Sequence, residues 1–141
     1  MSPWRRWSPP IVCMTLITAM SSTVVHSKQL IRSVASSSPV PVSEEGFMRF
    51  WASWWWLFVK GFHVLEFALL TWLVLRASAG RIMASAVIAL GFATLDELHQ
   101  AFVPDRGGLI TDVMIDSVGI ALACVAWIVL SRRQVEQRSE N

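Results

Sequence analysis

The amino-acid sequence predicts an all-α protein of the membrane, built as a polytopic bundle of four transmembrane helices. The 141 residues are 54% hydrophobic and only 16% charged, whereas soluble domains carry about 25% charged residues. Four apolar stretches approach the roughly 20 residues with which a helix crosses a bilayer. No internal repeat and no strand-like alternation of polar and apolar residues is visible. A single helical domain in lipid is therefore expected.

Composition also excludes several classes of protein. The chain is too hydrophobic to be disordered, and its formal charge of +2, without a basic stripe, argues against a nucleic-acid partner. The two cysteines, Cys13 and Cys124, each lie in an apolar stretch. We expect buried thiols there rather than a disulfide or a zinc site.

The first apolar stretch covers residues 9 to about 25, and two prolines at its start suit a helix N-terminus. We favour an uncleaved transmembrane helix within residues 1–26. The stretch is short and rich in Ser and Thr, so a signal peptide cleaved near Ala19 and Ser21 is the alternative. Cleavage would leave three transmembrane helices.

Residues 27–54 are predicted to form a polar extracytoplasmic loop. Serines and prolines concentrated in residues 36–43 are typical of a loop. A tryptophan cluster closes the segment and comprises Trp51, Trp54, Trp55 and Trp56. Trp prefers the membrane interface, because its ring is apolar and its N–H needs a partner. The cluster therefore indicates a membrane surface.

The rest of the chain is predicted to be a three-helix core over residues 55–131, followed by a tail over residues 132–141. Its spans are expected at about 55–75, 82–103 and 109–130, and the short linkers favour antiparallel neighbours.

Basic residues indicate the orientation of these spans. On one side lie Arg5, Arg6, Arg76, Arg81, Arg132, Arg133 and Arg138, and on the other Lys28, Arg32, Arg49 and Arg106. Cytoplasmic loops carry the excess of Lys and Arg, so both termini are expected in the cytoplasm. Cleavage of the first stretch would leave the cytoplasmic position of the C-terminus unchanged.

Polar residues interrupt each of the last three spans at the same end. They are Lys60, His63 and Glu66 in the second span, Asp96, Glu97 and Gln100 in the third, and Asp112 and Asp116 in the fourth, with Arg106 in the turn between the last two. Helical spacing places each set mainly on one face. A charge facing lipid costs about 2.5 to 3.5 kcal/mol at the bilayer centre, so we expect these faces to meet inside the bundle, in its outer half.

Acids outnumber cations in this predicted cluster. Glu66, Asp96, Glu97, Asp112 and Asp116 face only Lys60, Arg106 and the titratable His63. Such an excess favours protonated carboxylic acids, a charged histidine, or a bound cation or cationic ligand. The sequence leaves these alternatives open.

At these residues the chain resembles the VanZ-like family. The resemblance covers residues 55–130 and rests on three motifs: Lys60-x-x-His63-x-x-Glu66-Phe67, Asp96-Glu97-x-x-Gln100-x-Phe102-Val103-Pro104-x-Arg106, and Asp112-x-x-x-Asp116-x-x-Gly119. Phe67 stands where the family commonly has Tyr, and Asp105 where Gly is usual. The resemblance implies a small multi-span bacterial membrane protein, sometimes linked to teicoplanin-type glycopeptide resistance. It implies no established reaction.

The leading functional hypothesis is a binding protein of the bacterial inner membrane. The nine polar residues above would recognise a cell-envelope lipid, a wall precursor or a glycopeptide from the outer side. Membrane lipids are the expected partners, together with another copy of the chain or another membrane protein. No catalytic residue, metal ligand or cofactor is assigned under this hypothesis.

Two alternatives stay open. A membrane-embedded hydrolase would use a metal held by His63, Asp96 and Glu97, with His99 as a further candidate, although no H-E-x-x-H signature is present. A structural subunit would use the same residues as ion pairs that hold the helices together. Asp112 is also well placed to stabilise the start of its helix.

Overall fold

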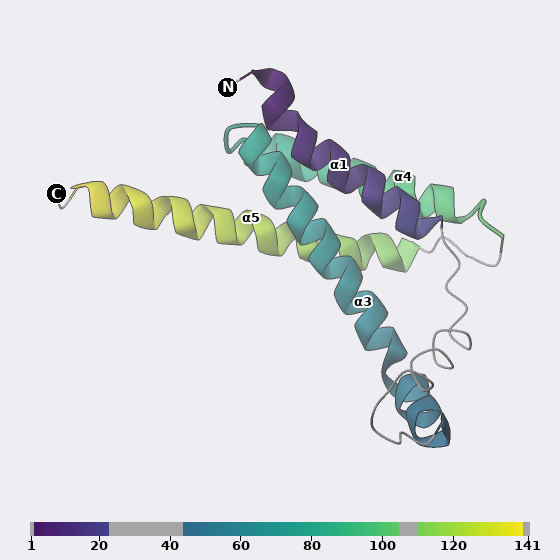
Figure 1. The fold of residues 1–141 in the computed structure, drawn as a ribbon. Coiled ribbons are helices and arrows are strands. Elements are labelled where there is room, and N and C mark those ends of the chain that lie inside the picture. Colours follow the sequence, from purple (N-terminus) through teal and green to yellow (C-terminus); the bar gives the residue numbers. More distant parts are fainter. Residues whose placement is uncertain (1, 23–43, 105–109, 140–141) are drawn as a thin grey trace.

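The computed structural model describes residues 2–22, 44–104 and 110–139, and every regular element within these ranges is helical. The elements are α1 (Pro3–Ser21), α3 (Glu44–Ala77), α4 (Ile82–Gln100) and α5 (Ile110–Ser139). Figure 1 shows α1 alongside α4, with α3 and α5 crossing each other. The predicted all-α bundle is confirmed.

Three of the helices are long and apolar enough to cross a membrane. The candidate spans are Met48–Ala77, Ile82–Gln100 and Ile110–Gln134. Large apolar side chains cover the outside of the bundle, including Leu65 and Met83, which are 68% and 78% exposed. Such a surface is suited to lipid. Helix α1 has 19 residues, as many as α4, but it is not among the candidate spans; it packs against α3 and α4.

Helix α3 begins at Glu44, well before the predicted start near residue 55. No proline interrupts this stretch, and side chains spaced along one face support the helix. The rings of Trp51 and Phe58 stack with centroids 6.1 Å apart, and Arg49 pairs with Glu45 at 3.8 Å. The tryptophan cluster is therefore helical, in a part of α3 that extends beyond the other helices (Figure 1). The loop residues predicted before this point lie outside the described residues.

A tight turn reverses the chain between α3 and α4. Ala79 and Gly80 have φ values of 57° and 80°, and the Gly80 N–H donates to the Leu75 carbonyl at 2.8 Å. This left-handed cap is typical of a helix C-terminus. A Cβ at Gly80 would lie 3.2 Å from the indole Nε1 of Trp127, so α5 packs against the same turn.

The directions of the helices follow from the contacts between them. Ser21, at the end of α1, bonds to Asp96 near the end of α4. Lys60 and then Trp72 of α3 contact Asp112 and then Trp127 of α5. Helices α1 and α4 therefore run one way, and α3 and α5 run the other. This arrangement confirms the antiparallel neighbours predicted for the last three helices.

The apolar core lies between these helices, and α3 contributes most to it. The fully enclosed positions include Phe67, Leu70 and Val74 of α3, packed with Ile17 of α1 and Ala93 of α4. Phe67 and Phe92 place their ring centroids 6.1 Å apart. Phe67 lies one turn after His63 on α3, so the apolar core begins next to the polar residues of that helix.

Helices α3 and α5 approach each other most closely at Gly119. A Cβ at this glycine would lie 2.2 Å from the backbone oxygen of Val64 and 3.0 Å from the backbone nitrogen of Ala68. Only a residue without a side chain permits such a contact, and small residues are characteristic of close helix packing in membranes. Gly119 therefore sets the distance between α3 and α5.

We predict that Gly119→Ala destabilises the protein, because the new methyl group meets the backbone of α3 rather than a side chain that can move. Overpacking of this kind costs about 1 to 3 kcal/mol. Thermal unfolding of the purified protein in detergent should show a clearly lower midpoint than wild type.

Gly91→Ala is the matched control, since a Cβ at Gly91 meets nothing within 4 Å. It should leave the midpoint unchanged or raise it slightly. Equal midpoints for the two variants would show that α3 and α5 are not in backbone contact at Gly119.

Candidate functional site

Polar side chains from all four described helices meet at one end of the bundle. We call them the polar cluster: Ser21 of α1, Lys60, His63 and Glu66 of α3, Asp96, Glu97 and Gln100 of α4, and Asp112 and Asp116 of α5. Asp96, Glu97, Gln100 and Asp116 are buried, each at most 5% exposed. The structure thus brings together eight of the nine residues singled out in the sequence. The ninth, Arg106, lies outside the described residues.

An ion pair joins α3 to α5 at the margin of the cluster. Lys60 Nζ contacts Asp112 Oδ1, and the two side chains remain 30% and 15% exposed. Asp112 also lies in the first turn of α5, where a carboxylate is favoured by the helix dipole. This pair therefore has a structural role of its own.

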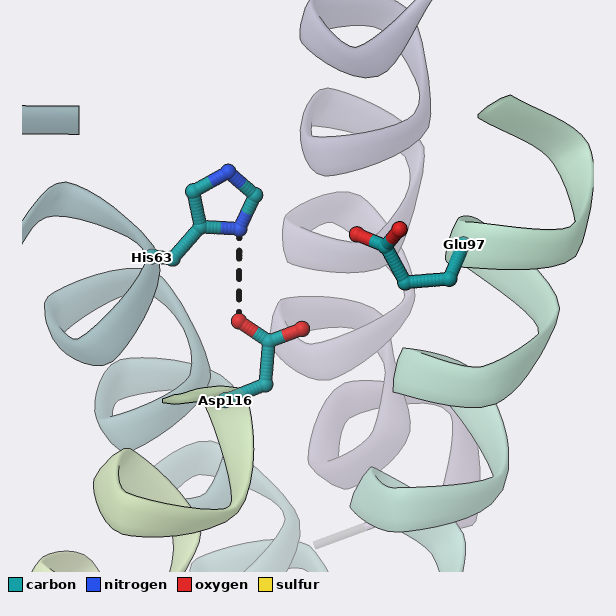
Figure 2. Close-up of side chains that lie close together, drawn as sticks. All are labelled: His63, Glu97 and Asp116. Atoms are coloured by element: carbon teal, nitrogen blue, oxygen red, sulfur yellow. Dashed lines mark ion pairs between the residues drawn. The ribbon is translucent and has the colours of Figure 1, made fainter. Parts of the chain in front are cut away.

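A second pair lies deeper, between His63 and Asp116. His63 Nδ1 is 3.2 Å from Asp116 Oδ1, and the Asp116 side chain is only 1% exposed (Figure 2). The distance is that of an ion pair, but within the described chain neither atom has a hydrogen-bond partner of acceptable geometry. Two buried polar atoms thus face each other without a hydrogen bond.

A hydrogen-bond network around Asp96 links α1 to α4. Asp96 Oδ2 accepts from Ser21 Oγ at 2.7 Å and from Gln100 Nε2 at 2.9 Å. Gln100 Nε2 also lies 3.3 Å from Glu97 Oε1, its acceptor one turn back on α4. The other carboxylate oxygen of Asp96, Oδ1, is buried and has no hydrogen-bond partner among the described residues.

The remaining two candidates occupy different positions. Glu66 is half-buried and within electrostatic range of His63, Asp96 and Asp116. His99 is exposed, and its Nε2 lies 3.0 Å from Ser22 Oγ. Glu66 thus belongs to the cluster, whereas His99 lies at its edge.

Three members of the cluster form a group suited to a metal ion. His63, Glu97 and Asp116 each present one ligand atom, and these atoms lie within 4.8 Å of one another. In Figure 2 the Glu97 carboxylate extends from α4 toward the pair formed by His63 and Asp116. The ligand set expected for a hydrolase, His63, Asp96 and Glu97 with His99 as a further candidate, shares His63 and Glu97 with this group but has Asp96 and His99 in place of Asp116. In the described part of the chain those two side chains are not in the group.

Sequence reasoning missed Ser21 as a member of the cluster. It was interpreted as a small residue near a cleavage site, but its hydroxyl is the donor to Asp96. The available signal was the pair of serines at positions 21 and 22, at the end of an apolar stretch. The nearby core residue Ile17 likewise makes α1 an integral part of the described bundle.

The fold and the cluster together define a multi-pass helical membrane protein with a buried polar site at one end of its bundle. The chain belongs to the VanZ/LLP1 family, whose model matches residues 9–131. This match confirms the resemblance seen in the three motifs and extends it to most of α1.

A curated relative supports the membrane assignment. The chain is 36% identical over 74 residues to the "Uncharacterized membrane protein YwnJ" of Bacillus subtilis (strain 168). The matched region is 52% of this chain and 51% of the relative, so the chain spans about half the length of that protein. No solved structure matches the chain.

We predict energetic coupling between Ser21 and Asp96. Ser21→Ala removes a donor to a buried carboxylate, and Asp96→Asn changes the acceptor, so their effects on stability should not add. Contacting residues typically show coupling energies of about 0.5 to 3 kcal/mol. Thermal or denaturant unfolding of the two single variants and the double variant in one detergent measures this energy.

Thr15→Ala provides the control, because Thr15 is exposed on the same helix and its hydroxyl donates to the Ile11 carbonyl. It should show no coupling to Asp96→Asn. Strictly additive effects of Ser21→Ala and Asp96→Asn would mean that α1 does not contact α4 through this pair.

Proposed function

We propose that the polar cluster binds the polar head group of a cell-envelope molecule: a lipid, a lipid-linked wall precursor or a glycopeptide. The supporting observation is a buried acid, Asp96, with one carboxylate oxygen that lacks a hydrogen-bond partner in the described structure. Leaving a buried acceptor unsatisfied costs about 1 to 3 kcal/mol. A group of acids maintained at such a cost is better explained by a ligand than by stability alone, because apolar residues would stabilise the bundle as well or better.

The chemistry of the cluster favours a particular kind of ligand. Its buried members are three carboxylic acids, one amide and one hydroxyl: Asp96, Glu97, Asp116, Gln100 and Ser21. Carboxylates accept hydrogen bonds from hydroxyl and ammonium groups. Sugar hydroxyls and amines are the donors that lipid head groups, wall precursors and glycopeptides have in common.

The arrangement of basic residues supports access from the outer side. Arg76 and Arg81 lie at the turn between α3 and α4, at the end of the bundle opposite the polar cluster. By the positive-inside rule, this arrangement supports a polar cluster in the outer half of the bacterial inner membrane, with the C-terminus in the cytoplasm. An envelope ligand would reach it there.

A structural role is the competing proposal. The pairs Lys60–Asp112 and Ser21–Asp96 each join two helices, which is what a device for docking helices requires. Under that role the cluster would contribute to stability and would hold no ligand.

We predict that Asp96→Asn weakens binding of the co-purifying envelope molecule. Replacing a carboxylate acceptor with an amide removes a charged hydrogen bond of about 1.5 to 3 kcal/mol, which lowers affinity about tenfold or more. Native mass spectrometry of the full chain, released from lipid nanodiscs, gives the occupancy of each bound molecule.

Glu45→Gln is the matched control, because it makes the same chemical change on an acid that is 89% exposed and outside the cluster. It should retain wild-type occupancy. If Asp96→Asn lowers the unfolding midpoint but binds the same molecules at the same occupancy as wild type, the structural role is correct and the binding proposal is wrong.

A role in glycopeptide resistance is part of the same proposal. At matched membrane levels, cells that carry Asp96→Asn should be more susceptible to teicoplanin than cells that carry Glu45→Gln. Equal inhibitory concentrations for the two strains would remove the resistance role and leave ligand binding to be judged by mass spectrometry.

A further inference from the structure

We infer that His63, Glu97 and Asp116 form a binding site for one divalent transition-metal ion, of the Zn²⁺ or Mn²⁺ class. The three residues come from α3, α4 and α5, and their ligand atoms lie within 4.8 Å of one another. This inference stands apart from the proposed envelope ligand, since it concerns the ion alone.

The distance between His63 and Asp116 fits two ligands of one ion. Ligand atoms that each lie about 2.0 to 2.2 Å from a tetrahedral ion are about 3.3 to 3.6 Å apart. His63 Nδ1 and Asp116 Oδ1 are separated by 3.2 Å. Glu97 has a longer and more flexible side chain, which allows its carboxylate to close the remaining distance from α4.

The hydrogen-bonding state of the same atoms points to a ligand between them. His63 Nδ1 and Asp116 Oδ1 are both buried and, among the described residues, without a hydrogen-bond partner. Buried polar atoms are rarely left unsatisfied, and Asp116 is 1% exposed. A metal ion that accepts a lone pair from each atom satisfies both at once.

Charge supports a divalent ion in this position. Two ionised carboxylates and a neutral imidazole carry a charge of about −2, and the acid Glu66 lies within electrostatic range. Several acids gathered in the low dielectric of a bundle repel one another at a high cost. A divalent cation offsets this negative charge, and Lys60 is already paired with Asp112.

Neighbouring residues hold the three ligands in place. Gln100 Nε2 lies 3.3 Å from Glu97 Oε1 and orients that carboxylate. The contact between Gly119 and Val64 fixes α5 against α3; Val64 directly follows His63, and Gly119 lies one turn after Asp116. Hydrogen bonds and packing around the ligands are what give a metal site its geometry.

The ligand set determines the class of ion and its coordination. An imidazole with two carboxylates suits zinc and manganese, whereas magnesium and calcium prefer oxygen ligands alone. Three protein ligands are typical of sites that keep an open position for water or another molecule. A donor atom of a ligand in the polar cluster can occupy that position.

Metal binding to the purified full-length protein tests the inference. The protein carries a purification tag without histidine, is treated with a chelator, and is titrated with MnCl₂ or ZnCl₂ alone. We expect wild type to retain close to one equivalent of one of these metals after desalting, measured by inductively coupled plasma mass spectrometry. His63→Gln and Asp116→Asn should each weaken the affinity about tenfold or more.

Glu45→Gln is the control, since it replaces a carboxylate that is 89% exposed and lies outside the polar cluster. Its metal affinity should equal that of wild type. Substoichiometric binding by wild type, or an equal loss of affinity in Glu45→Gln and Asp116→Asn, overturns the inference.

The wild-type stoichiometry decides the question even where a variant fails to fold. A wild-type protein that binds its envelope molecule but retains neither metal would leave the proposed function standing and remove the metal site. His63 and Asp116 would then be a simple ion pair.

Discussion

The backbone contact between α3 and α5 at Gly119 is the constraint on which the polar cluster depends. Val64 directly follows His63 on α3, and Gly119 lies one turn after Asp116 on α5. A contact at this point brings the histidine and the aspartate to within 3.2 Å. It also directs the start of α5 toward Lys60, so both ion pairs between these helices have the same geometric origin. Helices α4 and α1 then contribute the remaining polar side chains of the cluster.

Buried charge is tolerated because the polar residues share one end of the bundle. If the charges were spread along the spans, each one would need its own partner in a medium of low dielectric. At one end of the bundle the polar residues are partners for one another. Asp96 accepts hydrogen bonds from Ser21 and Gln100, and Lys60 pairs with Asp112. Phe67, which follows Glu66 on α3, lies in the apolar core and packs against Phe92.

The sequence predicted the helices and the end at which their polar faces meet, because hydropathy and helical spacing report the surface that each helix must bury. It did not predict which side chains pair across helices, since the crossing of α3 and α5 depends on a contact between backbones. The grouping of His63 with Asp116 rather than with Asp96 follows from that crossing. The early start of α3 was not predicted, because tryptophans indicate a membrane interface but do not distinguish a helix from a loop there. Ser21 was missed because its partner lies on a distant helix.

The residues of the polar cluster follow one another along α3 and α5 in an order that connects the proposed envelope ligand with the proposed metal site. Lys60 precedes His63 on α3, and Asp112 precedes Asp116 on α5, in each case by about one turn. The Lys60–Asp112 pair is partly exposed, whereas Asp116 is enclosed. Under the two proposals, a molecule that enters from this end of the bundle would meet the ion pair first and the three potential metal ligands second. A head group long enough to pass the pair would place its innermost donor atom beside His63, Glu97 and Asp116, at the coordination position that an ion held by three protein ligands would leave open.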